Sequence, residues 1–313
     1  MKIVFCGTGD IGLPSLKALA DSPRHEVVGL ITQPDRPAGR DLRPRPPAVK
    51  TEAISRGIPV AQPERIRKDF TALAAWNPDL MVVAAYGQIL PREVLNLPRL
   101  GCLNLHASLL PRHRGASPIQ ATILAGDAET GVTAMFVGEG LDTGDILLAC
   151  GIPVFPDETA GELHDRLAAL APGVLLESLA LLENGSAVRT PQDSSLATYA
   201  PKLARQDGRL DWREPAGRLA RRVRAMNPWP GASARLAGNI LKIHSAAESL
   251  EGGAPGSVLS ADPGGIRVAA GKGSLVLREV QLEGKKRLPA DEFLRGFPLP
   301  SGTMFDLSFS VPP

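Results

Sequence analysis

Short apolar runs alternate with helical patterns along the first third of the chain. Three of these runs, at residues 2–6, 26–32 and 80–84, are rich in β-branched residues or Leu and are bounded by Gly, Pro or Asp, as buried strands are. The stretches 13–20 and 49–56 between them have the spacing of helices. This alternation predicts a parallel sheet with right-handed crossovers, which is a Rossmann-like α/β architecture.

The pattern changes further along the chain. A long helix is predicted over 160–183, and polar residues follow it. After about residue 208, one helix precedes five short alternating strands, predicted at 232–236, 240–245, 256–259, 266–269 and 274–281. Glycine-rich turns separate them, which predicts a small β-barrel resembling an OB fold. We therefore expect an α/β domain over 1–190, a linker over 191–207 and a β-barrel domain over 208–313.

Composition narrows the class of protein. The 313 residues are 43% hydrophobic and 22% charged, which is typical of globular proteins and excludes a disordered chain or a coiled coil. No apolar run approaches the ~18 residues that span a bilayer, so no membrane partner is expected. The cysteines Cys6, Cys102 and Cys150 are odd in number and far apart, so a disulfide framework is not expected. These features favour a cytoplasmic protein, which we expect to be a monomer.

The net charge of +2 hides an asymmetry. Residues 1–200 carry a net charge of −4 and residues 201–313 a net charge of +6. This division favours chemistry in the first part and contact with a polyanion in the second. A basic surface that is merely solvated explains the charge equally well.

A glycine motif near the N-terminus imitates a dinucleotide site. Gly7, Gly9 and Gly12 form a G-x-G-x-x-G between a strand and a helix. The carboxylate of Asp10 would oppose a phosphate there, and Asp35 comes too late to be the ribose-binding acid. Glycines also allow a strand and a helix to pack closely, so we do not expect NAD. The histidines and cysteines lack metal-binding spacing, and no metal is expected.

The most informative residues are Asn104, His106 and Asp142. Asn104 and His106 are two apart at the end of a predicted buried strand, so their side chains project to the same side. An amide can stabilise an oxyanion, and an imidazole can move a proton. Asp142, in a glycine-rich loop, can orient the imidazole. The alternative is a structural Asn–His pair with Asp142 as an ordinary turn residue.

Six segments together resemble a known family. They are 104–112 (Asn-Leu-His-Ala-Ser-Leu-Leu-Pro-Arg), 114–116 (Arg-Gly-Ala), 138–145 with Asp142, 33–40, 227–231 (Asn-Pro-Trp-Pro-Gly) and 283–286. The chain resembles the 10-formyltetrahydrofolate-dependent formyltransferases over nearly its whole length, and among them those that formylate methionyl-tRNA. It departs from the family pattern in two places. The sequence of the turn at 9–12 differs from that of the family, and His113 occupies a position where the family usually has an aromatic residue.

The resemblance implies roles for residues at the matching positions. It makes Asn104, His106 and Asp142 the catalytic trio and 10-formyltetrahydrofolate the formyl donor. The acceptor it implies is the α-amino group of methionine on initiator tRNA. The residues implied for the folate site are Ser108, Leu109, Leu110, Pro111, Tyr86, Gly87, Ile89 and Leu90.

Two basic regions are candidates for the contact with tRNA. A long loop over 35–50 is rich in Arg and Pro, and in the resembled family it enters the acceptor stem of initiator tRNA. A helix over 215–226 carries four arginines beside the predicted barrel, and a Lys cluster follows later. Solvated loops and helix faces are the alternative. The candidates are Arg36, Arg40, Arg43, Arg45, Arg218, Arg222, Lys285 and Lys286.

Other functions remain open at this point. A sugar-nucleotide or glycinamide ribonucleotide formyltransferase would share the trio but would not need the basic regions. A nicotinamide-dependent dehydrogenase would rest on the glycine motif alone. An RNA-binding module would need no chemistry from the trio.

Overall fold

The computed structural model describes residues 1–38 and 43–308 and divides the chain into two compact units. The first unit contains residues 1–118, 129–153 and 164–201. The second contains residues 119–128 and 154–163 and the chain from residue 202 onward. The segment expected to be a linker therefore divides between the two units after Pro201.

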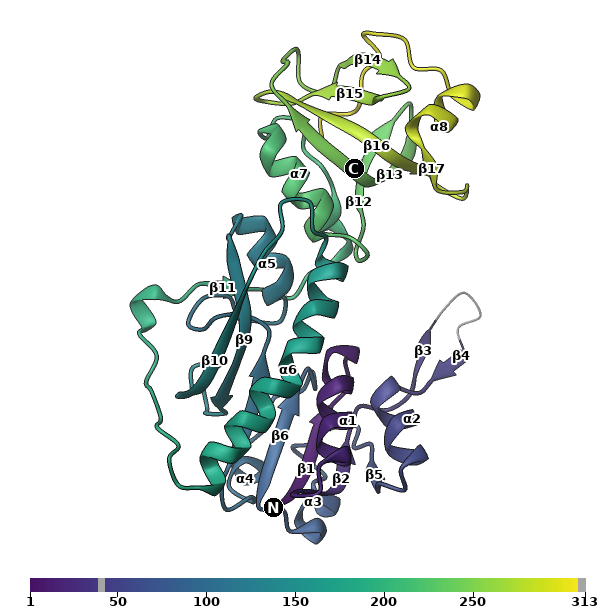
Figure 1. Cartoon of the computed structure of the whole chain (residues 1–313). Helices are drawn as coiled ribbons and strands as arrows, with labels where there is room; N and C mark the ends of the chain where they lie inside the picture. The colour runs from purple at the N-terminus through teal and green to yellow at the C-terminus, as the bar shows by residue number, and fades with distance from the viewer. Residues whose placement is uncertain (39–42, 309–313) are drawn as a thin grey trace. The chain divides into compact units, whose positions relative to one another are not determined.

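The first unit is built on a seven-stranded sheet with the strand order β10-β9-β7-β6-β1-β2-β5 (Figure 1). The strands are β1 (Lys2–Gly7), β2 (Glu26–Ile31), β5 (Val60–Ala61), β6 (Leu80–Ala84), β7 (Cys102–His106), β9 (Glu129–Phe136) and β10 (Ile146–Pro153). The five strands from β5 to β7 pair in parallel, and β9 and β10 add antiparallel pairings at one side. The parallel strands end at one edge of the sheet, where open α/β sheets hold ligands.

Helices and short strands lie between the strands of this sheet along the chain. The helices are α1 (Leu13–Asp21), α2 (Ala48–Ser55), α3 (Thr71–Trp76), α4 (Arg92–Leu95) and α6 (Ala160–Glu183), of which α6 begins in the second unit. The short strands are β3 (Arg36–Ala38) with β4 (Arg43–Arg45), and β8 (Arg114–Gly115) with β11 (Tyr199–Ala200). The 3-10 turns are η1 (Asp10–Gly12) and η2 (Ser194–Leu196).

The sheet forms because its strands are apolar on both faces. Every residue of β6 is buried, and β1 is buried from Ile3 to Gly7. A cluster of buried side chains from β1, β6 and β7, including Val4, Met81 and Cys102, makes the core on one face. Because side chains on both faces of these strands are buried, apolar residues occupy successive positions, which explains the continuous apolar runs in the sequence.

The second unit is dominated by an antiparallel sheet with the order β12-β13-β16-β15-β14, to which β17 is added beside β16. The strands are β12 (Ala232–Leu236), β13 (Asn239–Ser249), β14 (Val258–Asp262), β15 (Gly265–Ala269), β16 (Ser274–Leu282) and β17 (Leu288–Pro289). The helices are α5 (Pro118–Ala125), α7 (Ala216–Ala225) and α8 (Ala290–Gly296), with the 3-10 turn η3 (Arg205–Gly208). Its core contains Trp212, which is fully buried against Phe305 with ring centroids 5.2 Å apart.

The predicted fold class, a Rossmann-like domain followed by a small sheet-rich domain, is confirmed. The long helix and β12 match their predicted ranges residue for residue. β13 is longer than predicted because bulges near Ser245 interrupt its alternation without ending the strand. No helix in the described residues combines the length and the apolar character needed to cross a membrane.

Candidate active site

The site begins at the end of β7, the strand that carries Asn104 and His106. Asn104 pairs through its backbone with Val83 on β6 and Met135 on β9, so its position is set by the middle of the sheet. Its side chain is partly buried, and the amide makes no hydrogen bond or ion pair with the rest of the described chain. The amide therefore remains available to a substrate oxygen.

His106 is held by its own chain. Its side chain is only 6% exposed, and Nε2 lies 2.9 Å from the carbonyl oxygen of His113. A carbonyl oxygen accepts and cannot donate, so in the neutral imidazole the proton is on Nε2. Nδ1 then carries a free lone pair, and it lies 3.6 Å from Oδ2 of Asp142.

Asp142 reaches this position because its loop folds back toward the sheet. Its backbone is left-handed, with φ +50, and its carboxylate accepts a hydrogen bond of 2.9 Å from the backbone N–H of Gly115. Gly144 closes the loop against β9, where a Cβ would collide with the carbonyl oxygen of Phe136. The loop can take this path only because Gly144 has no side chain.

These contacts decide the charge of the imidazole. Burial lowers the pKa of His106, while the Asp142 carboxylate and the hydrogen bond to His113 act in the opposite direction. The imidazole is therefore neutral at pH 7 and can accept a proton on Nδ1 beside a carboxylate that stabilises the resulting cation. A free amide next to a neutral base suits the attack of an amine on a carbonyl carbon.

The residues predicted for the folate site fall into two groups. In the segment 108–111, Ser108 is fully buried, and its hydroxyl donates to the carbonyl of Arg112 at 2.7 Å. Thr133 on β9 binds the backbone of this segment at both Ser108 and Leu110. Ser108 thus holds the turn after β7 in place, and its hydroxyl is already used by the carbonyl of Arg112.

The second group follows β6. Tyr86 is buried, and its carbonyl accepts a 2.7 Å hydrogen bond from the amide of Gln33. Gly87 takes φ +82, which turns the chain outward, and Ile89 is then 88% exposed. Leu90 packs partly against the core. The apolar side chain of Ile89, five residues beyond the carboxyl end of β6, is exposed enough to cover a flat ring.

The glycine motif serves packing. A Cβ on Gly7 would lie 2.7 Å from the carbonyl oxygen of Ala84, and one on Gly12 would lie 3.1 Å from the Cβ of the same residue. Asp35 is already paired with Lys50 at 2.8 Å and with Gln62. The motif brings β1 and its helix close to β6.

The predicted tRNA-binding residues differ in their surroundings. Arg36, Arg43 and Arg45 are exposed on the β3–β4 hairpin, and Arg40 lies outside the described residues. In the second unit Lys285 and Lys286 are exposed.

The arginines of α7 have partners in the second unit. Arg218 is 61% exposed and pairs with Glu214 at 3.1 Å. The side chain of Arg222 is 17% exposed and is held by Glu214 and the carbonyl of Arg209. Arg222 therefore contributes first to fixing the helix.

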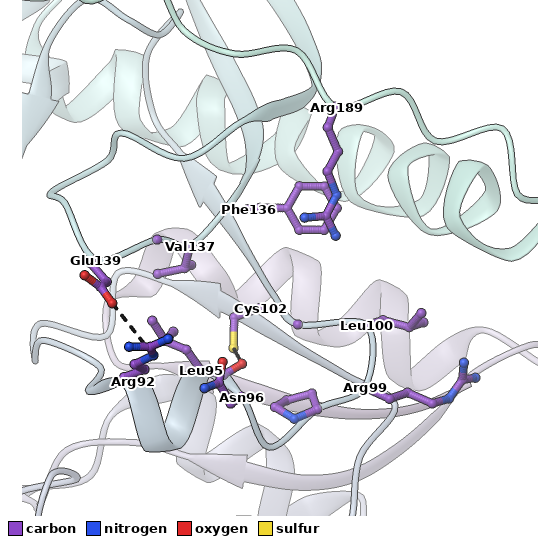
Figure 2. Close-up of a pocket in the computed structure, with 13 residues that line it drawn as sticks. Arg92, Leu95, Asn96, Arg99, Leu100, Cys102, Phe136, Val137, Glu139 and Arg189 are labelled. Carbon is purple, nitrogen blue, oxygen red and sulfur yellow. Dashed lines mark hydrogen bonds and ion pairs between the residues drawn. The ribbon is translucent and has the colours of Figure 1, made fainter.

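A pocket of about 440 Å³ lies in the first unit, at the start of β7 (Figure 2). Its walls come from α4, from the segment 98–102 and from the start of the loop that leads to Asp142. Arg189 lies over the ring of Phe136, 3.7 Å from the ring centroid, and Arg92 faces Glu139 (Figure 2). None of the trio and none of the predicted folate residues lines it.

The described part of the chain brings together no group of three His, Cys, Asp or Glu side chains that could hold a metal ion.

Family models account for most of the chain. The formyl transferase model matches residues 1–179, and the model of the formyl transferase C-terminal domain matches residues 202–298. The chain belongs to the formyl transferase family.

Relatives and solved structures agree with this. The chain is 47% identical over 304 residues to the methionyl-tRNA formyltransferase of Citrifermentans bemidjiense, covering 96% of this chain and 95% of the relative. It is 52% identical over 290 residues to that of Pseudomonas paraeruginosa, covering 92% and 93%. Its fold is similar to the methionyl-tRNA formyltransferase of Clostridium thermocellum, with a TM-score of 0.57, 17% identity and coverage of 79% and 93%.

A further similar fold is that of HypX from Aquifex aeolicus, solved in complex with tetrahydrofolic acid. The TM-score is 0.61 at 21% identity. The match covers 94% of this chain but only 47% of HypX, so this chain spans about half of that protein.

Sequence reasoning gave no role to three residues that contact the trio, although Gly115 belongs to a segment of the family resemblance and His113 is a departure from the family pattern. Gly115 binds the Asp142 carboxylate, His113 binds His106, and Gln192 binds the Asp142 loop through two hydrogen bonds. Gln192 lies in the polar stretch expected to be a linker, and nothing in its sequence surroundings marks it. Its role depends on where that stretch runs in the folded unit.

Proposed function

We propose that this formyl transferase moves the formyl group of 10-formyltetrahydrofolate to the α-amino group of methionine on initiator methionyl-tRNA. The observation that carries the proposal is the trio: Asn104 with its amide free lies two residues before His106 on β7, and Nδ1 of His106 is 3.6 Å from the Asp142 carboxylate. The identity of 47–52% to methionyl-tRNA formyltransferases over more than nine-tenths of the chain supports the acceptor.

The chemistry requires one bond to form and one to break. The neutral α-amine attacks the formyl carbon, and negative charge develops on the formyl oxygen. The Asn104 amide donates to that oxygen, which is the role its lack of an internal partner permits. The bond from carbon to N10 then breaks, N10 takes a proton, and the amine loses one.

His106 and Asp142 handle the proton in this scheme. Burial keeps the imidazole neutral, so Nδ1 can take the proton from the attacking amine. The carboxylate beside it stabilises the imidazolium until the proton passes to the leaving nitrogen. The residues of the folate set other than Ser108, among them Ile89 with its side chain 88% exposed, would hold the donor.

The tRNA contacts that we propose rest on exposed cations of the described residues and on the family resemblance at Arg40. Arg36, Arg43 and Arg45 on β3 and β4 would meet the acceptor end. Arg40, which lies outside the described residues, would meet it too. Lys285 and Lys286 would meet the phosphate backbone, where each contact adds salt-dependent affinity. Because one chain supplies the whole trio, we propose a monomer. Its acceptor is a substrate of translation, so we place it in the cytoplasm.

The test offers the protein several acceptors with one donor. Purified protein is incubated with 10-formyltetrahydrofolate and methionine-charged initiator tRNA, with charged elongator tRNA, with glycinamide ribonucleotide or with an amino-sugar nucleotide. Formylated product is measured by mass spectrometry. We expect N-formylmethionyl-tRNA from the initiator tRNA and little product from the others. Formylation of a small acceptor without formylation of methionyl-tRNA would overturn the proposal.

A further inference from the structure

The chain that follows α6 crosses the loop that carries Asp142. Gln192 on this segment donates from Nε2 to the carbonyl oxygens of Asp142, at 2.9 Å, and of Gly144, at 2.7 Å. Its Oε1 accepts from Nε and Nη2 of Arg114, at 3.0 and 2.8 Å. A side-chain amide has two donors and one oxygen with two lone pairs, so the amide of Gln192 is fully used.

This arrangement joins the two pieces of chain that set the position of the carboxylate. Arg114 precedes Gly115, whose N–H binds Oδ2 of Asp142. Gln192 thus ties the backbone of Asp142 to the residue next to the donor that orients its side chain. We call Arg114 and Gln192 the amide clamp.

The Asp142 loop needs such a clamp because its own backbone is permissive. Glycines at 138, 140 and 144 leave the loop few conformational restraints. The left-handed conformation of Asp142 is strained for a non-glycine residue, so it persists only where contacts impose it.

The rest of the segment is tied down on either side of the clamp. Thr190 pairs with Ile146 through both backbone groups, and Thr198 accepts a 2.8 Å hydrogen bond from the N–H of His113. Gln192 is therefore anchored at a defined place before it reaches the loop.

We propose that Gln192 is a positioning residue that, together with Arg114, holds the Asp142 carboxylate against Nδ1 of His106. The inference rests on the proposed function of the trio. Gln192 does not touch the reacting atoms, so its loss should act through the Asp142 to His106 distance. A shift of about 1 Å in a catalytic group can lower a rate by about 100-fold.

The clamp should also influence the titration of His106. The charged and titratable groups that act on this imidazole are Asp142 and His113. The carboxylate raises its pKa against the lowering by burial, so an Asp142 that moves away leaves the pKa of His106 lower still. A purely structural role for Gln192 would not produce this change.

The experiment compares Gln192→Leu and Gln192→Glu with Asp193→Ala. The first variant removes all four hydrogen bonds, and the second is isosteric but sets a carboxylate against two carbonyl oxygens. Asp193→Ala is the matched control, because Asp193 caps η2 on the same segment through Ser195 and does not touch the Asp142 loop.

For both Gln192 variants we expect kcat to fall about 10- to 100-fold. We expect KM for tRNA to change less than about threefold in both variants. In Gln192→Leu, which adds no charge near His106, the acidic limb of the kcat–pH profile should move to lower pH. Asp193→Ala should keep the wild-type kcat and profile. Wild-type kcat in both Gln192 variants, or a decrease that is matched by Asp193→Ala, would overturn the proposal.

A second measurement separates this inference from the function itself. The His106 ring is followed by NMR through a pH titration in the wild-type protein and in Gln192→Leu, which adds no charge near the ring, with the His106→Gln variant providing the assignment. A lower midpoint in Gln192→Leu supports the clamp even if the wild-type protein transfers no formyl group. An unchanged midpoint overturns the clamp whether or not formyl transfer is observed.

Discussion

Replacing Asn104 by Ala tests the oxyanion role most directly. The amide makes no hydrogen bond with the described chain, so truncation breaks no internal hydrogen bond, and the backbone pairing with Val83 and Met135 does not depend on the side chain. Stability should therefore change by no more than about 0.5 kcal/mol, as for substitutions away from special features. Removing one oxyanion donor costs about 2.7–4 kcal/mol of transition-state stabilisation, which is about a 10²- to 10³-fold fall in kcat.

The assay measures kcat and KM with methionine-charged initiator tRNA and the folate donor, and thermal unfolding of the same samples. The expected result is a large fall in kcat with a small change in KM and in melting temperature. Asn96→Ala is the control, because Asn96 is an exposed asparagine of the first unit outside the trio. A kcat within about threefold of wild type would refute the oxyanion role. A fall that accompanies unfolding would assign Asn104 to the fold instead.

Four more predictions concern the buried imidazole, the Asp142 loop, the core of the second unit and its basic surface. Burial lowers the pKa of His106, so the folded protein binds its proton less readily than the unfolded chain, and stability should fall as pH drops below the unfolded value of about 6.5. Urea unfolding at several pH values measures this, and His106→Gln should flatten the dependence. Gly144→Ala places a Cβ on a backbone carbonyl, so the loop must move and kcat should fall by more than about 10-fold in the standard assay. Trp212→Ala should cost about 3–5 kcal/mol in chemical unfolding, as for other fully buried large side chains, and Trp212→Phe much less, because Nε1 of Trp212 has no hydrogen-bond partner to lose. Reversing the charge of both Lys285 and Lys286 to Glu should raise KM for tRNA and lower the salt slope of binding by about one for each phosphate that is no longer neutralised, with kcat at saturation little changed.

Each of these has an outcome that contradicts it. A flat pH dependence in the wild-type protein would deny that burial depresses the His106 titration. Full activity in Gly144→Ala would show that the loop tolerates the displacement. Equal destabilisation in both Trp212 variants would point to the indole nitrogen, and an unchanged salt slope would remove the lysines from the tRNA interface.

Local patterns predicted α6 and β12 well because one regular spacing of apolar residues continues along the whole of each element. The Leu-rich stretch that forms α6 and the alternation that forms β12 give the same ranges in sequence and structure. The pattern was too short to predict β5, α3 or α4, which span two, six and four residues. It was misleading in β13, where bulges shift the alternation between the two faces.

The sequence alone predicted the parallel sheet, the α/β domain followed by a β-rich domain, and the placement of Asn104 and His106 on the same side of one strand. These depend on spacing within one strand and on the continuous apolar runs of its neighbours. Tertiary structure decided the rest of the site. His113, Gly115 and Gln192 act through backbone groups or from a segment far along the chain, so their residue types do not reveal which atoms of the trio they bind. The carboxylate of Asp142 meets His106 only because a glycine-rich loop folds back and hydrogen bonds from separate segments hold it there.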